Sequence, residues 1–107
     1  GAWGTAERRS ANTPDVRDYA ENPRVAISAA GRIAVTWIAQ PPSGSYAVWG
    51  QIFEGGAWLP AQAIMTSGND IDVDAEHALA MAGSGMPLAV WAEWPAGAYP
   101  LVGAVWR

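Results

Sequence analysis

The chain repeats itself once, and this repetition restricts the possible folds more than any other feature of the sequence. Aligning Gly85 with Gly31 brings two copies of one pattern into register. The matched pairs are Leu79 with Val25, Met81 with Ile27, Trp91 with Trp37, Pro95 with Pro41, Tyr99 with Tyr46 and Gly103 with Gly50. The period is roughly 53 to 54 residues, a size typical of repeat units that bury their hydrophobic faces against neighbouring units. We therefore expect a repeat architecture.

The two copies are circularly permuted by one segment. Residues 1–7 (GAWGTAE) match residues 56–62 (GAWLPAQ) in register, and residues 12–21 share the acidic, turn-rich character of residues 67–76. We predict three divisions of the chain. Residues 1–21 form the fourth strand of a unit that two chains share, followed by a linker, and residues 22–66 form a complete unit. Residues 67–107 form a second linker and the first three strands of the shared unit.

Each copy consists of short apolar segments separated by turn residues. In the first copy we expect strands over residues 24–28, 32–39, 46–53 and 57–65, with turns or loops over 29–31, 40–45 and 54–56. The 12 Gly and 8 Pro interrupt the chain too often for long helices, and a hydrophobic content of 50% excludes a disordered chain. The sequence therefore predicts an all-β protein.

The strand expected at residues 33–39 is apolar on both faces, as in a sheet that neighbouring sheets cover on both sides. We predict two four-stranded antiparallel blades of a β-propeller in each chain. Two blades cannot close a ring, so residues 2–10 of one chain are expected to complete the sheet begun by residues 77–107 of the next. This head-to-tail contact predicts a homo-oligomer, a trimer with six blades or else a tetramer with eight. The alternative is a monomeric β-sandwich of about eight strands.

The first copy also resembles a known kind of repeat. It reads PRVAISAAGRIAVTW over residues 23–37, then YAVWGQIF over residues 46–53 and GAW over residues 56–58. This series resembles the Trp-rich blades of bacterial exported β-propeller proteins. It departs from them at Ser28 and Ala82, where those blades usually have Asp. The resemblance implies a β-propeller and an extracellular location, and it carries no catalytic motif.

Composition excludes several classes of function. The net charge is −4, and the six basic residues are all Arg, which argues against binding of nucleic acid or of an anionic membrane surface. No apolar run approaches the roughly 20 residues of a membrane-spanning helix, so no membrane insertion is expected. There is no cysteine, and His77 is the only histidine, without a Gly-x-Ser-x-Gly motif to accompany it. We therefore predict neither an enzyme nor a cofactor.

An acidic segment offers the one pattern that suggests a metal. Asp70, Asp72 and Asp74 place carboxylates at alternate positions, and hard cations such as Ca²⁺ prefer oxygen ligands. The segment lacks the Gly that would let it wrap around an ion, and alternate residues of an extended strand do not converge. We predict an acidic linker here, and no metal site.

Aromatic residues near the predicted loops suggest a ligand site. Trp94 follows Glu93 at the mouth of a loop, and its repeat counterpart is Gln40; Tyr46 and Tyr99 lie on equivalent loops. An exposed ring can stack on a sugar while a carboxylate accepts hydrogen bonds from its hydroxyls. We predict lectin-like carbohydrate binding by these five residues, strengthened by multivalency in the oligomer. The alternative is a structural or self-assembling module without ligand, because interfaces also favour Trp and Tyr.

Overall fold

Strands make up all the regular structure that can be described. The computed structural model describes residues 1–7, 21–39, 46–64, 70–71, 77–94 and 101–106. Within these ranges every element is a β-strand, and every strand pairs antiparallel with its neighbour. The prediction of an all-β protein with antiparallel sheets is therefore confirmed.

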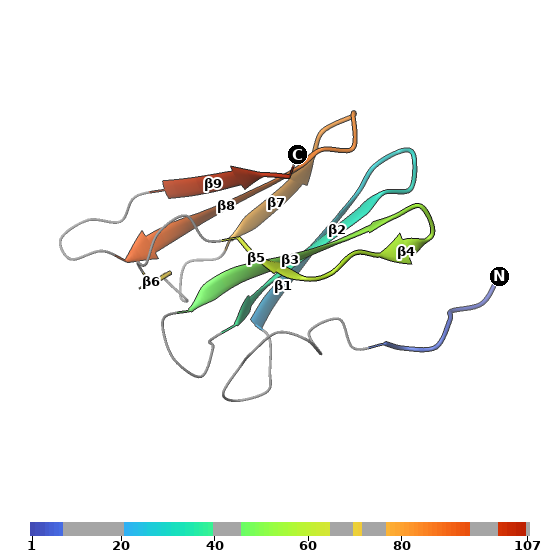
Figure 1. Ribbon diagram of the computed structural model, residues 1–107, viewed down its shortest axis with the longest axis horizontal. Coiled ribbons are helices and arrows are strands. Elements are labelled where there is room, and N and C mark those ends of the chain that lie inside the picture. Colours follow the sequence, from blue (N-terminus) through green and yellow to red (C-terminus); the bar gives the residue numbers. More distant parts are fainter. Residues whose placement is uncertain (8–20, 40–45, 65–69, 72–76, 95–100, 107) are drawn as a thin grey trace.

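The first sheet is formed by strands that follow one another along the chain. Its strands are β1 (Glu21–Ile27), β2 (Ile33–Ala39), β3 (Ala47–Glu54), β4 (Ala57–Trp58) and β5 (Gln62–Ala63). β1, β2 and β3 pair in that order, and both β4 and β5 pair with the outer edge of β3 (Figure 1). The turns expected at residues 29–31 and 54–56 lie between strands of this sheet, as predicted, whereas the loop expected at residues 40–45 lies outside the described residues.

The fourth segment of the first sheet differs from the single strand expected at residues 57–65. Phe53 pairs with Trp58, and Gly50 pairs with Gln62, so the outer segment has one more residue than β3 between these two pairs. Pro60 lies in this interval and has no N–H to donate. A bulge at this point therefore separates β4 from β5.

The second sheet is centred on β8. Its strands are β6 (Asp70–Ile71), β7 (Ala78–Met81), β8 (Pro87–Trp94) and β9 (Leu101–Val105). β9 pairs with one edge of β8, whereas β6 and β7 pair with the other edge. The pairing of β6 was not expected, because the acidic composition around it indicated a linker.

The two sheets have the same register at the described strand pairs that the sequence alignment equates. Val25 pairs with Val35 in the first sheet, and Leu79 pairs with Ala89 in the second. On the other side of the central strand, the pair of Thr36 and Gly50 corresponds to the pair of Val90 and Gly103. The internal repeat of the sequence is thus also a repeat of backbone hydrogen bonding.

The first hairpin turn of each sheet also repeats. Gly31 has a φ of +82° and Gly85 a φ of +83°, a left-handed conformation that favours glycine. The Gly31 N–H donates to the Ser28 carbonyl at 3.0 Å, and the Gly85 N–H donates to the Ala82 carbonyl at 2.8 Å. The glycine at this position in both copies is therefore required by the turn.

Each sheet has two faces, which we name by the residues they carry. Side chains alternate between the faces along a strand, and cross-strand partners share a face. In the first sheet, face A carries Thr36, Ile38 and Val48, and face B carries Val25 and Trp37. The repeat counterparts define the same faces of the second sheet. There, face A carries Val90, Ala92 and Leu101, and face B carries Leu79 and Trp91.

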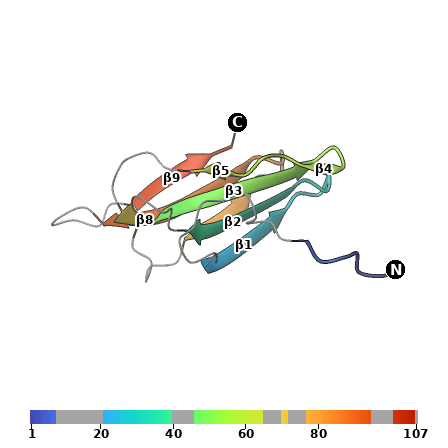
Figure 2. The same ribbon diagram turned by 60° about the horizontal axis from the view of Figure 1, so that its bottom comes forward.

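The core forms where face A of the first sheet packs on face B of the second. It contains Ile38 and Val48 from the first sheet together with Ala89 and Trp91 from the second. Figures 1 and 2 show the two sheets layered, and the most extensive approach between their strands is that of β1 to β7. The sheets therefore contact each other through non-equivalent faces, as successive units of a repeat series do. A two-fold axis would instead bring equivalent faces together.

Candidate functional site

A buried hydrogen bond joins the two sheets at the centre of this interface. His77 Nε2 lies 2.7 Å from Thr36 Oγ1, and both side chains are buried. His77 immediately precedes β7 and extends face B of the second sheet, whereas Thr36 is in the middle of β2 on face A of the first. Because buried polar groups need partners, this pair specifies how the two sheets align.

A second polar contact joins the two sheets at their hairpin turns. Arg32 Nη1 donates to the Gly85 carbonyl at 2.7 Å, and Arg32 Nη2 lies 2.7 Å from Glu54 Oε2. Glu54 holds the guanidinium from its own sheet, while the carbonyl belongs to the turn of the other sheet. Arg32 therefore links equivalent turns of successive repeats.

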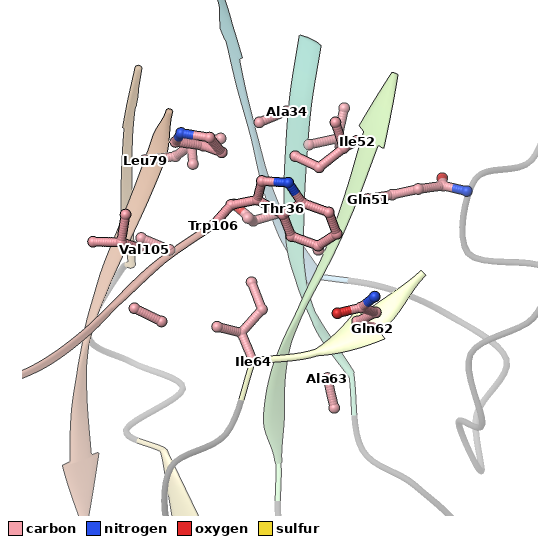
Figure 3. A pocket seen from close by; sticks show the side chains of 15 residues that line it. Ala34, Thr36, Gln51, Ile52, Gln62, Ala63, Ile64, Leu79, Val105 and Trp106 are labelled. Carbon is pink, nitrogen blue, oxygen red and sulfur yellow. The ribbon is translucent and has the colours of Figure 1, made fainter. Parts of the chain in front are cut away.

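A cavity of about 160 Å³ lies between the sheets, and most of its lining comes from β2, β3, β5, β8 and β9, with Leu79 of β7 and no residue of β1. Apolar side chains form most of its wall, and Thr36, Gln51 and Gln62 are its polar lining residues. Figure 3 shows Trp106 reaching from the end of β9 toward Thr36, with Ile64 below it. The sheets thus meet closely at their first strands and leave space nearer their outer strands.

The remaining two faces of the stack carry exposed apolar residues. On face A of the second sheet, Leu101 is 76% exposed, and Leu88 and Val105 are also exposed. On face B of the first sheet, Val25 and Ile27 are each 63% exposed, although Trp37 on the same face is buried. The counterparts of these residues at the interface between the sheets are buried or half-buried.

The outer edges of the two sheets differ. The edge of β3 is covered by β4 and β5, and the ring of Trp58 packs edge-on against that of Phe53 with centroids 5.3 Å apart. Within the described ranges, no strand pairs with the equivalent edge of β9. Residues 1–7, which match the β4 region in sequence, extend away from both sheets, and Trp3 is fully exposed (Figures 1 and 2).

The residues expected to bind carbohydrate are only partly described. Glu93 is 4% exposed and its backbone pairs with Ile71 of β6, while Tyr46 is half-buried and packs against the core. Trp94 ends β8 and pairs with Asp70 through the backbone. Gln40 and Tyr99 lie outside the described residues. The described members are therefore a buried carboxylate and a core-packed ring, and the prediction of a site shared by all five stays a prediction.

The metal candidates are likewise only partly covered. Asp70 is in β6, and Asp72 and Asp74 lie outside the described residues. Among the residues that the structure describes, no three His, Cys, Asp or Glu side chains gather in a way that could hold a metal ion.

The sequence showed His77 as the only histidine but revealed neither its partner nor the role of Arg32. Both contacts involve one residue whose repeat counterpart has different chemistry: Thr36 corresponds to Val90, and Arg32 corresponds to Met86. A polar residue that occurs in only one of the two matching copies was the available signal for a contact that the other copy cannot make at the same position.

Comparison with known proteins does not assign the chain to a family. No protein-family model, curated protein or solved structure matches it. Among the elements described, none is a helix long and apolar enough to cross a membrane. The geometry of the sheets and their contacts is therefore the basis for any functional conclusion.

Proposed function

We propose that this protein is a self-assembling structural module whose copies join head to tail by sharing a sheet. Residues 1–7 of one copy add to the outer edge of β9 in the next and supply its fourth strand. The observation that carries the proposal is the contrast between the two edges: a GAW segment covers β3, and a matching GAW segment extends from the sheets while the edge of β9 has no strand among the described residues.

The first sheet supplies a template for the shared one. There the Leu59 N–H donates to the Ile52 carbonyl at 2.8 Å, and the Ile64 N–H donates to the Val48 carbonyl at 2.7 Å. The repeat counterparts of these acceptors are the carbonyls of Val105 and Leu101 on β9. By the same correspondence, Trp3 of the incoming segment lies opposite Trp106, as Trp58 lies opposite Phe53. Strand addition to an open edge of this kind is a general mode of recognition.

The stacking of the sheets favours a closed ring. The first strands β1 and β7 approach each other most, and the cavity lies toward the outer strands, so successive sheets diverge from a common side. A head-to-tail series of diverging sheets closes into a ring when the rotation from one sheet to the next is a whole fraction of a full turn. We propose a trimer of six four-stranded β-propeller blades, with a tetramer of eight blades as the other closed form.

Light scattering coupled to size-exclusion chromatography, run over a concentration series, tests the assembly directly. A species of three or four times 11.3 kDa that persists on dilution is the expected result. Trp3→Ala should weaken association at least about thirtyfold, because truncating a large aromatic anchor is costly at an interface.

Trp58→Ala is the matched control for Trp3→Ala. Trp58 packs on Phe53 within one chain, so its removal should lower the stability of the folded chain. Trp3 is fully exposed in the single chain, so its removal should leave unfolding of the dissociated protein unchanged. A folded wild-type monomer at all concentrations, or a Trp3→Ala variant that assembles like wild type, contradicts strand sharing.

A further inference from the structure

We infer that face A of the second sheet is a docking surface for face B of the first sheet in a second copy of this chain. The inference rests on the proposed assembly and adds to it a second, larger contact. Strand sharing uses the edge of β9 and the N-terminal segment, whereas this contact uses two apolar faces that the single chain leaves exposed in part, at Leu88, Leu101 and Val105 on one and at Val25 and Ile27 on the other.

The interface between the sheets within one chain is the model for this contact. Inside the chain, face A of the first sheet packs on face B of the second and forms the core. Face A of the second sheet and face B of the first are the repeat counterparts of those two surfaces, in the same register. A second copy placed as the next member of the series therefore brings together two surfaces of the kinds that already pack within the chain.

The chemistry of face A in the second sheet suits an apolar partner. The residues that β7, β9 and β8 as far as Ala92 place on this face are uncharged and small or aliphatic: Ala78, Ala80, Leu88, Val90, Ala92, Leu101, Gly103 and Val105. By register, the backbone pair of Asp70 and Trp94 continues the face at β6. Opposite it, face B of the first sheet presents the exposed Val25 and Ile27. Over the part of face A formed by β7, β8 and β9, no charged group has to be buried when the two surfaces meet, and contiguous exposed apolar surface is a mark of protein interfaces.

The polar pair at the internal interface has an apolar counterpart at the proposed one. Within the chain Thr36 meets His77 at 2.7 Å. The repeat counterpart of Thr36 is Val90 on face A of the second sheet, and the counterpart of His77 is Pro23, which precedes Val25 on face B of the first. Both members of the pair have changed together from hydrogen-bonding to apolar. That paired change is expected if Val90 of one copy contacts Pro23 of the next, because a single polar member would be buried unpaired.

A double-mutant cycle between Val90 and Pro23 tests this contact. The variants are Val90→Thr, Pro23→His and the double variant, which installs the internal hydrogen-bonded pair at the proposed interface. Each single variant should weaken association about tenfold or more, because it buries a polar group without its partner. The double variant should recover most of that loss. Within one chain Val90 is on the far face of the other sheet from Pro23, so no coupling is expected in unfolding of the dissociated protein.

A charge on the docking surface gives a second test that does not depend on the cycle. Leu101→Asp places a carboxylate on face A of the second sheet and should reduce association at least about a hundredfold. The control Gln62→Glu adds the same charge at an exposed position of β5, on neither docking face, and should leave association within about twofold. Both are measured by sedimentation velocity over a dilution series.

The outcomes separate this inference from strand sharing. If Trp3→Ala dissociates the assembly but Leu101→Asp and the cycle have no effect, the docking surface is wrong and strand sharing stands. If the cycle shows coupling while Trp3→Ala assembles normally, the docking surface stands and strand sharing is wrong. A wild-type protein that is monomeric at every concentration overturns both.

Discussion

Replacing Thr36 by Val should destabilise the folded chain, because it removes the hydroxyl that contacts His77 across the two sheets. The two atoms are 2.7 Å apart, and the side chains of Thr36 and His77 are 3% and 2% exposed. Valine has nearly the shape of threonine, so packing changes little and the lost hydrogen bond dominates. Leaving a buried polar group without this partner costs about 1–3 kcal/mol. With a typical urea m-value, the unfolding midpoint should fall by about 1 M.

The companion variant His77→Leu and the double variant Thr36→Val/His77→Leu complete a cycle. His77→Leu alone should cost more than Thr36→Val alone, because the imidazole makes further interactions beyond the one with Thr36. The double variant should be more stable than the sum of the single losses by about 1 kcal/mol or more, since neither member of the pair then remains.

Urea unfolding followed by tryptophan fluorescence measures all four proteins. The same protein concentration must be used throughout, because association would stabilise the folded state by mass action. A Thr36→Val variant within about 0.5 kcal/mol of wild type, or fully additive losses in the double variant, would refute the reasoning that this hydrogen bond aligns the sheets.

Three further predictions concern separate features. Arg32→Met removes the donor to the Gly85 carbonyl and should cost about 1–2 kcal/mol, lowering the thermal midpoint by several degrees, whereas Glu54→Gln should cost less because that contact is partly exposed. Gly50→Ala would place a Cβ 2.7 Å from Ile64 Cδ1, the end of a flexible side chain that can turn aside, so it should cost less than about 1 kcal/mol; in an Ile64→Val background, which lacks that carbon, the same substitution should cost nothing measurable in the same thermal assay. Trp94→Ala should abolish any glycan binding and leave the oligomer intact. A glycan array that stays silent with the wild type at millimolar saccharide argues against lectin-like function, and loss of assembly would make Trp94 an interface residue instead.

Much of the fold could be predicted because the alternating apolar residues and turn glycines of each hairpin agree with the repeat along the chain. The hairpin between β1 and β2 follows from alternating apolar residues on either side of Gly31, whose left-handed φ the turn requires. Matching Gly85 to Gly31 then predicted the second hairpin, and the register of the two sheets agrees with that alignment. Because both copies are expected to form the same strands and turns, a wrong assignment in one copy would have disagreed with the pattern of the other.

Other features depend on contacts that local patterns do not encode. The bulge at Pro60 and the two-residue β6 arise from pairing with β3 and β8, and neither has a distinctive periodicity of its own. For the candidate site, Glu93 was expected at a loop mouth beside Trp94. Its burial results from its position on face B of β8, which the first sheet covers. Distance along the chain from a loop does not determine exposure when another sheet packs on that face.

The clearest difference between the sequence pattern and the single chain concerns β2 and β8. Both strands carry apolar residues on both faces, and β2 has buried residues on both, including Ile38 on face A and Trp37 on face B. β8 is buried on face B at Ala89 and Trp91, but Leu88 on its face A is exposed. Apolar side chains stabilise a fold when they are buried, so apolar residues on a face that stays in contact with water would contribute nothing to stability. The pattern of β8 is therefore that of a strand with a sheet on each side, and the second copy inferred above supplies the missing sheet.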